Sequence, residues 1–131
     1  MPTIDYKINQ PISAQQFIDL LEKTTLGVRR PLSDRSCMQG MVENANLMVT
    51  AWIGERLVGV ARSVTDFYYC CYLSDLAVDQ EYQKCGIGKR LIELTEQQLK
   101  PSAKLILLAA PAANEYYPTL GFEHNPRAWV K

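Results

Sequence analysis

The groups best suited to chemistry lie in one short segment, Gln83–Lys89, with the sequence Gln-Lys-Cys-Gly-Ile-Gly-Lys. Apolar residues recur at helical spacing from Ile87 onward, so the segment stands where a helix begins. The first turn of a helix leaves four main-chain N–H groups without partners and carries a partial positive charge. Because glycine has no side chain, Gly86 and Gly88 let a large anion approach those N–H groups closely. The segment therefore predicts a cradle for a phosphate group.

The spacing of the two glycines excludes the common nucleotide-binding motifs. A dinucleotide-binding loop needs a third glycine three residues after Gly88, where this chain has Leu91. A P-loop needs four residues between its glycines and then Lys-Ser or Lys-Thr, whereas Arg90 follows Lys89 here. A Gly-x-Gly pair by itself also suits a plain turn between a strand and a helix. A diphosphate on some other carrier stays compatible with the spacing.

Two further motifs flank the glycine segment, one on each side. Ser74-Asp75-Leu76-Ala77-Val78 precedes it, and Tyr117-Pro118-Thr119-Leu120-Gly121-Phe122 follows the next expected strand. With these flanks, the chain resembles the GNAT superfamily of acyl-CoA-dependent N-acetyltransferases. The residues that match the family pattern, in the family's order, are Leu76 and Val78, then Gln83, Gly86 and Gly88, then Tyr117, Gly121 and Phe122. The resemblance is specific for fold and coenzyme and unspecific for the acyl acceptor.

The resemblance implies a mixed α/β fold and a coenzyme. We expect one GNAT-like domain over residues 1–131, with a mostly antiparallel central sheet, a βαβ crossover and a splayed pair of parallel strands. Acetyl-CoA would be the co-substrate, with no metal. Its diphosphate would lie on the glycine segment, and its pantetheine arm would pair with the strand before it, where an N–H of Leu76 or Ala77 would face the thioester oxygen. The implied coenzyme-binding residues are Leu76, Ala77, Val78, Gln83, Lys84, Cys85, Gly86, Ile87, Gly88, Lys89 and Asn114. Asn114 could instead cap the short helix.

Two residues are the catalytic candidates, Tyr117 and Asp75. The resemblance implies that Tyr117 protonates the departing thiolate, and the alternative is a buried aromatic residue whose hydroxyl has a structural partner. Asp75 is the first candidate to accept the amine's proton because it lies beside the reactive strand segment, and Asp66 is the second. Asp75 could instead cap a turn, or bind the ammonium without taking its proton. Cys85 is disfavoured as a nucleophile because direct transfer needs no acyl-enzyme.

The acceptor is expected to be a primary amine of a small molecule. The run Leu57–Arg62, followed by Asp66, also looks like a subgroup that acetylates arylalkylamines or other small amines. The alternatives are acetylation of protein lysines or N-termini, and a module that binds acyl-CoA without turnover. Aromatic residues could line an amine pocket or belong to the core: Trp52, Phe67, Tyr68, Tyr69, Tyr72 and Trp129. Arg29, Arg30 and Arg35 could meet an acidic acceptor or form a solvated basic loop.

The composition disfavours several other classes of protein. Fourteen basic and fourteen acidic residues in 131 give a formal net charge of zero, which disfavours a nucleic-acid-binding domain. No apolar run approaches the roughly 20 residues that a membrane span needs, and the start lacks the pattern of a secretion signal. We therefore expect a cytoplasmic protein with reduced thiols. A single histidine, His124, offers neither a zinc site nor a familiar catalytic triad.

The elements that must position these residues follow from the apolar periodicity. Antiparallel strands come first and a crossover follows. The expected strands are 3–9, 47–53, 56–64, 70–78, 105–109 and 128–130, and the expected helices run from Ser13 to Lys23, from 33 or 34 through Val42, from Ile87 to Leu99 and over 113–119. The chain ends nine residues after Phe122, so we expect short final strands and an acceptor pocket that is open or completed by a second subunit. A homodimer is left open.

Overall fold

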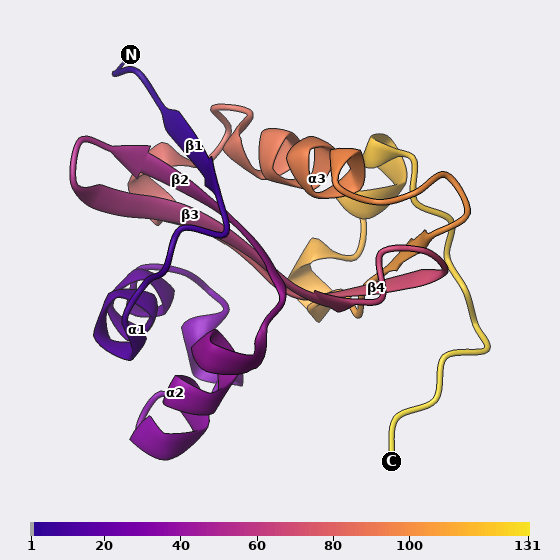
Figure 1. The fold of residues 1–131 in the computed structure, drawn as a ribbon, viewed down its shortest axis with the longest axis horizontal. Coiled ribbons are helices and arrows are strands. Elements are labelled where there is room, and N and C mark those ends of the chain that lie inside the picture. Colours follow the sequence, from indigo (N-terminus) through magenta and orange to yellow (C-terminus); the bar gives the residue numbers. More distant parts are fainter. Residues whose placement is uncertain (1) are drawn as a thin grey trace.

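The computed structural model describes residues 2–131 and contains one five-stranded sheet with the order β1-β2-β3-β4-β5 (Figure 1). The strands are β1 Asp5–Ile8, β2 Leu47–Ile53, β3 Arg56–Thr65, β4 Cys70–Val78 and β5 Lys104–Ile106. The first three pairings are antiparallel, whereas β5 runs parallel to β4. The expected mixed α/β class, with a mostly antiparallel sheet and one parallel pair, is confirmed.

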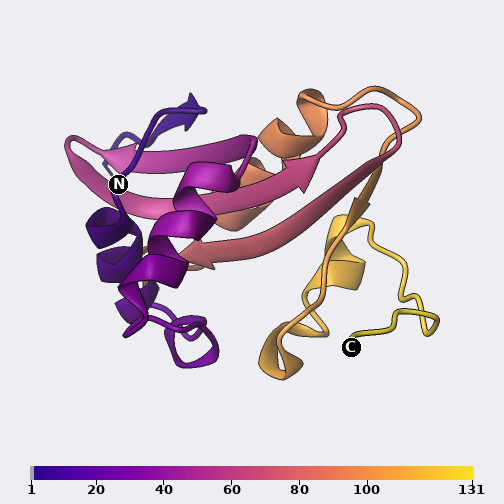
Figure 2. The same ribbon diagram turned by 60° about the horizontal axis from the view of Figure 1, so that its bottom comes forward.

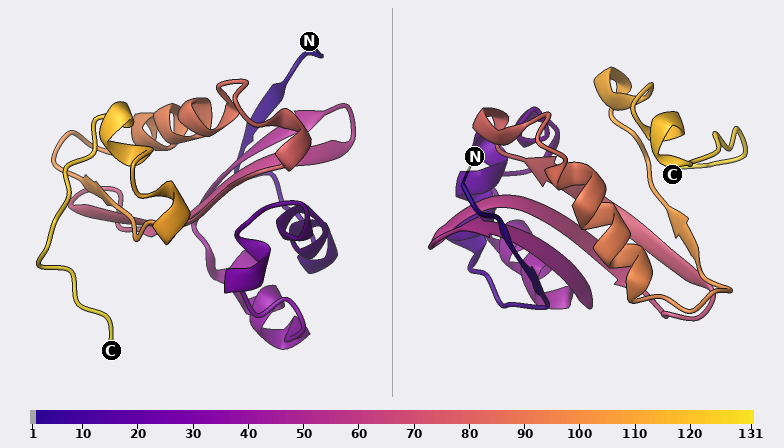
Figure 3. Two further views of the ribbon diagram at one scale, coloured as in Figure 1. Left: turned by 180° about the vertical axis from the view of Figure 1, so that it is seen from behind. Right: turned by 90° about the horizontal axis from the view of Figure 1, so that it is seen from above.

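Helices cover both faces of the sheet. Helices α1 Ala14–Glu22 and α2 Arg35–Asn44 pack on one face, and α3 Ile87–Gln97 packs on the other (Figures 1 and 3). On β2, Met48 belongs to the core on the α1 and α2 side, and its neighbour Val49 belongs to the core on the α3 side. Because both faces are covered, β2 and β3 are apolar on both sides.

Capping side chains explain where α1 and α2 begin. The Ser13 Oγ accepts a hydrogen bond from the Gln16 N–H at 3.0 Å, and the Gln16 side chain accepts one from the Ser13 N–H at 2.9 Å, which together form a capping box. Asp34, one of the two expected caps, accepts from the Cys37 N–H at 3.0 Å. Four short 3-10 helices join the main elements: η1 Gly27–Arg29, η2 Gln80–Tyr82, η3 Pro111–Ala113 and η4 Tyr117–Leu120.

Strands β4 and β5 separate after a short paired stretch. β5 pairs only with residues Cys70–Tyr72 of β4, and Figure 2 shows the two strands diverging beyond that point. Within β4, Ser74 has no partner on β3, because Asp75 pairs with Arg62 while Leu73 pairs with Ser63. This is a β-bulge, which re-aims the residues that follow it. The β4 edge beyond Tyr72 is therefore left without a neighbouring strand on the β5 side.

The C-terminal part departs from the expected elements. The expected buried strand 105–109 is the shorter β5 at the sheet edge, where Ile106 is 48% exposed. The expected helix 113–119 is two separate 3-10 helices, η3 and η4. The expected strand 128–130 is absent, since residues 123–131 form no helix or strand and Trp129 is 94% exposed. Within residues 2–131, no helix has the length and apolar character required to cross a membrane.

Candidate active site

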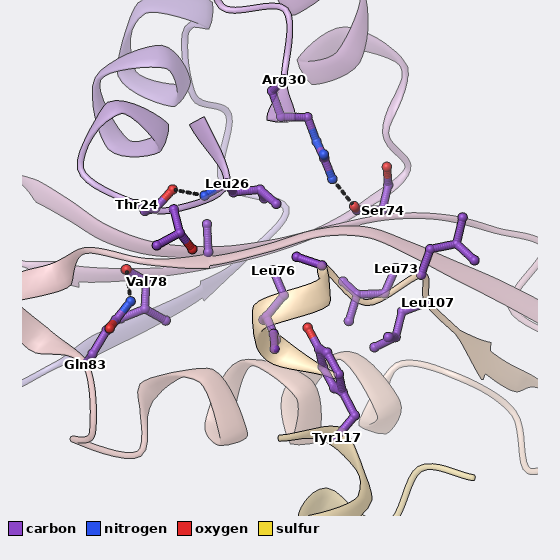
Figure 4. A pocket seen from close by; sticks show the side chains of 15 residues that line it. Thr24, Leu26, Arg30, Leu73, Ser74, Leu76, Val78, Gln83, Leu107 and Tyr117 are labelled. Atoms are coloured by element: carbon purple, nitrogen blue, oxygen red, sulfur yellow. Dashed lines mark hydrogen bonds between the residues drawn. The ribbon is translucent and has the colours of Figure 1, made fainter. Parts of the chain in front are cut away.

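A cavity of about 90 Å³ lies where β4 and β5 separate (Figure 4). Figure 4 shows Arg30 on one side of β4 and Tyr117 on the other. The lining residues come from the chain after α1, from β4 with the turn that follows it, and from the chain after β5. They are Thr24, Thr25, Leu26, Arg30, Leu73, Ser74, Leu76, Ala77, Val78, Gln83, Leu107, Leu108, Ala110, Ala113 and Tyr117.

Two hydrogen bonds to β4 mark the two ends of this cavity. The Gln83 Nε2 donates to the Val78 carbonyl at 3.4 Å, and the Arg30 Nη2 donates to the Ser74 carbonyl at 2.9 Å. Ser74 and Val78 are four residues apart on the strand, which corresponds to about 13 Å. The glycine segment therefore adjoins one end of the cavity, and Arg30 lies at the other end.

The main-chain N–H groups of the glycine segment have no hydrogen-bond partner among the described residues. Gly86 is the N-cap of α3 with a φ of 80°, a left-handed conformation that favours glycine, and no side chain caps the helix. None of the main-chain N–H groups from residue 83 to residue 89 donates a hydrogen bond to another described residue, and the first α3 bond is Arg90 N–H to the Gly86 carbonyl at 3.0 Å. The N-terminus of α3 is therefore free to bind an anion.

Gly88 lies in close contact with the side chain of Tyr116. A Cβ atom at this position would lie 3.0 Å from the Tyr116 hydroxyl oxygen, which is tighter than ordinary contacts allow. The segment after β5 thus folds back until Tyr116 lies against the first turn of α3. This contact links the glycine segment to the η4 region that carries Tyr117.

The predicted coenzyme-binding residues fall into three groups. Four of them line the cavity, namely Leu76, Ala77, Val78 and Gln83. The rest of the glycine segment forms the adjoining turn and the start of α3, with Lys84, Cys85 and Lys89 exposed and Ile87 buried in the core. Asn114 follows the last residue of η3 and is exposed, and it is not part of the lining.

Tyr117 lines the cavity, and Figure 4 shows its hydroxyl directed toward β4. That hydroxyl forms no hydrogen bond with any described residue, and the ring contacts Phe122 and Tyr116 edge-on, with centroids 5.5 and 5.4 Å apart. Burial, together with the neighbouring Tyr116, raises the pKa of Tyr117 above its usual value. The phenol therefore keeps its proton at neutral pH, as a proton donor must.

The structure places Asp75 outside the cavity. Its side chain is fully buried, with one oxygen accepting from the Arg30 Nε at 2.5 Å and the other from the Arg62 Nε. With both oxygens engaged by guanidinium groups, Asp75 is a structural link between β3, β4 and the chain after α1. The geometry does not support the expected role of Asp75 as acceptor of the amine's proton.

Asp66, the second candidate base, organises the turn between β3 and β4. One of its oxygens accepts from the main-chain N–H groups of Tyr68, Tyr69 and Cys70 at 2.9, 2.8 and 3.1 Å. These bonds lower the pKa of Asp66, because they stabilise its charged form. Asp66 therefore stabilises a turn and does not line the cavity.

Arg30, for which the sequence indicates either a contact with an acidic acceptor or a solvated loop, lines the cavity. It is the one charged side chain in the cavity lining, which otherwise holds no Asp, Glu, His, Lys or Cys. The signal for its network was present in the strands: Arg62 and Asp75 interrupt two apolar runs, and their pairing register makes them neighbours. None of the six aromatic residues considered for an amine pocket lines this cavity, and Trp52 belongs to the core instead.

Comparison with known proteins identifies the family to which the chain is similar. The family model for the acetyltransferase (GNAT) domain matches residues 19–128. A chloroplastic GCN5-related N-acetyltransferase of Arabidopsis thaliana is 34% identical over 74 residues, which is 55% of this chain and 29% of that protein. A histone acetyltransferase of Glycine max is 36% identical over 74 residues, 55% of this chain and 32% of that protein. The chain thus spans about a third of the length of these curated relatives.

Solved structures share the fold across nearly the whole chain. A GNAT-family acetyltransferase of Streptococcus pneumoniae superposes with a TM-score of 0.79 at 20% identity, covering 98% of each chain. An aminoglycoside N-acetyltransferase in complex with CoA superposes with a TM-score of 0.73 at 14% identity, covering 98% of this chain and 93% of that one. Within residues 2–131, no cluster of His, Cys, Asp and Glu has the arrangement of a metal site.

Proposed function

The chain belongs to the GNAT family of acetyltransferases, and from that premise we propose that it transfers an acetyl group from acetyl-CoA to a primary amine of a small molecule. The observation that carries the proposal is the run of free main-chain N–H groups at residues 83–89, which adjoins a cavity into which the unbonded hydroxyl of Tyr117 points. A homodimer and a cytoplasmic location stay predictions.

The groups around the cavity suit the two halves of coenzyme A. The free N–H groups at the start of α3 would bind the diphosphate, and Lys84 and Lys89 add positive charge beside them. The β4 edge from Leu73 to Val78 has no strand beside it on the β5 side, so it would pair with the amide groups of the pantetheine arm as with an added strand. The reacting end would then lie near Leu76.

Acetyl-CoA supplies the acetyl group as a thioester. A main-chain N–H of Leu76 or Ala77 would stabilise the negative charge that develops on the thioester oxygen, a contribution of about 3–4 kcal/mol in comparable sites. Tyr117 would donate its proton to the sulfur as the C–S bond breaks and the C–N bond to the amine forms. Because the cavity lining holds no carboxylate or imidazole, the amine would enter in its neutral form. After the attack its nitrogen would release one proton to solvent, and the Tyr117 phenolate would regain a proton from solvent.

Acetylation of a protein lysine is the second candidate function. One observation favours it, namely the similarity of 55% of the chain to a histone acetyltransferase of Glycine max. A protein lysine and a small alkylamine present the same amino group, so turnover with each class of acceptor separates the two candidates.

Two measurements, made one after the other, test the proposal. Calorimetry with acetyl-CoA first establishes binding, and an assay of thiol release then compares small amines with lysine-containing peptides. We expect binding and turnover with a small amine. Turnover confined to peptides would favour the second candidate, and binding without any turnover would make the protein an acyl-CoA sensor.

A further inference from the structure

We propose that the acceptor amine carries a carboxylate or another anionic group, and that Arg30 binds this group. The inference deepens the proposed function and rests on it, because it names the class of amine that the same cavity takes. It begins from the charge of the lining. Arg30 is the one charged side chain among the lining residues, so no lining group offsets it and none would attract a second ammonium group.

The net charge of Arg30 and the ionised side chains in contact with it is positive. Arg30 and Arg62 share a single carboxylate, that of Asp75, with one oxygen for each guanidinium. Among the ion pairs of residues 2–131, no second acid contacts either arginine. Two guanidinium groups and one carboxylate leave one positive charge in a largely buried place, where screening by solvent is weak.

Arg30 also has hydrogen-bond donors to spare. A guanidinium has five N–H donors. Three donations are made, from Nε to Asp75, from Nη2 to the Ser74 carbonyl, and from Nη1 to the Arg29 carbonyl. Two donors remain, one on each Nη atom, and two such donors suit a carboxylate or phosphate. The three hydrogen bonds hold the side chain in place, and because it is 22% exposed a ligand can still reach it.

The position of Arg30 assigns it to the acceptor rather than to the coenzyme. It donates to Ser74, whereas the free N–H groups for the diphosphate begin beyond Val78, about 13 Å along β4. In the proposed binding mode the thioester lies near Leu76, which comes before Ser74 along β4 from the glycine segment, so the coenzyme ends before Arg30. The space beside Arg30 is therefore left for the second substrate.

The same charge acts on the amine itself. A positive group beside the cavity disfavours the ammonium form, which lowers the pKa of a bound amine and raises the neutral fraction that can attack. This compensates in part for a lining without a carboxylate or imidazole. Polyamines and aminoglycosides, which carry several ammonium groups, are disfavoured by both effects.

Matched acceptors test the inference directly. The probes are pairs that differ in one group, each an amino acid and the amine that remains when its carboxylate is removed, together with the diamine putrescine. The kcat/KM of each is measured with saturating acetyl-CoA. We expect at least one amino acid to exceed its decarboxylated partner by about tenfold or more, and putrescine to be the poorest acceptor.

Two variants separate an anion-binding role from a purely structural one. Arg30→Gln should remove the preference mainly by raising the KM of the anionic acceptor, while Arg30→Lys should keep part of it through charge. The control is Arg35→Gln, because Arg35 contacts Gln15 and does not line the cavity, and it should keep the preference unchanged. Calorimetry with acetyl-CoA monitors the coenzyme site in each protein.

The outcomes distinguish the inference from the function on which it rests. If acetyl-CoA binds and neutral or cationic amines are used as well as or better than their anionic partners, the inference is wrong and the proposed function stands. Binding of acetyl-CoA without turnover of any anionic amine overturns the inference as well. If acetyl-CoA does not bind to the folded protein, the proposed function fails and the inference fails with it.

Discussion

The two ends of the cavity are built in different ways. At the α3 end, the groups available to a ligand are main-chain N–H groups, freed by a left-handed glycine and by the lack of a capping side chain. At the opposite end, the available groups belong to one side chain, Arg30, which is fixed by Asp75 and by the carbonyl of the β4 bulge. The first end suits a constant ligand, since N–H groups are present whichever side chains the segment carries, whereas the second end can change its preference with one residue.

The largest effect is expected from Gly86→Glu at the α3 end. A side chain at a φ of 80° is strained, and its carboxylate would lie beside the bound diphosphate. Like charges in contact cost several kcal/mol, so the affinity for acetyl-CoA should fall by about a thousandfold or more. Calorimetry measures this, and thermal unfolding checks the fold. The matched control is Gly40→Ala, on an open site within α2, which should bind the coenzyme normally.

Asp75→Asn addresses the other end and should mainly reduce stability. The change leaves Arg62, which is 9% exposed, and Arg30 without their shared carboxylate. Removing one partner of a buried pair leaves an uncompensated charge, and we expect the free energy of unfolding to fall by about 3 kcal/mol. Denaturant unfolding measures it. Asp79→Asn is the control with a smaller expected loss, because its partner Arg56 is 40% exposed. If Asp75→Asn left the stability unchanged and removed the rise of kcat/KM with pH, Asp75 would be the base.

Tyr117→Phe should reduce turnover and leave coenzyme binding nearly unchanged. The hydroxyl is the proton donor in the proposed reaction, and general acid catalysis contributes less when the leaving thiol has a pKa near 8.5. We expect kcat to fall by about 10- to 100-fold. Tyr116→Phe is the matched control, because the Tyr116 hydroxyl lies against Gly88 and Tyr116 does not line the cavity. Equal losses in the two variants would contradict the role of Tyr117.

The value of kcat/KM should rise with pH and should not fall again below about pH 10. With no base in the lining, log kcat/KM should rise by about one per pH unit until the pKa of the acceptor amine, near 10 for an alkylamine. The acid function of Tyr117 requires the protonated phenol, and its pKa lies above its usual value, so no loss is expected below about pH 10. Stopped assays across the pH range check this, and a bell-shaped profile centred near neutrality would contradict it.

The difference between the two ends also explains what the sequence could predict. The glycine segment is local, so the sequence predicts a helix that begins at Ile87, as α3 does, and the strands from β1 to β4 follow from short-range periodicity. Arg30 meets Ser74 across 44 positions in the chain, and no local pattern encodes such a contact. The misplacement of Asp75 has the same cause, because both partners of its carboxylate come from distant segments.

The most direct test of the central claim compares acetyl-CoA with acetyl-pantetheine, which lacks the diphosphate and the nucleotide, by calorimetry on the wild-type protein. If the main-chain N–H groups of residues 83–89 hold the diphosphate, acetyl-CoA binds and acetyl-pantetheine binds at least about a hundredfold more weakly. Equal affinities for the two, or no heat with acetyl-CoA from a folded protein, would contradict the account.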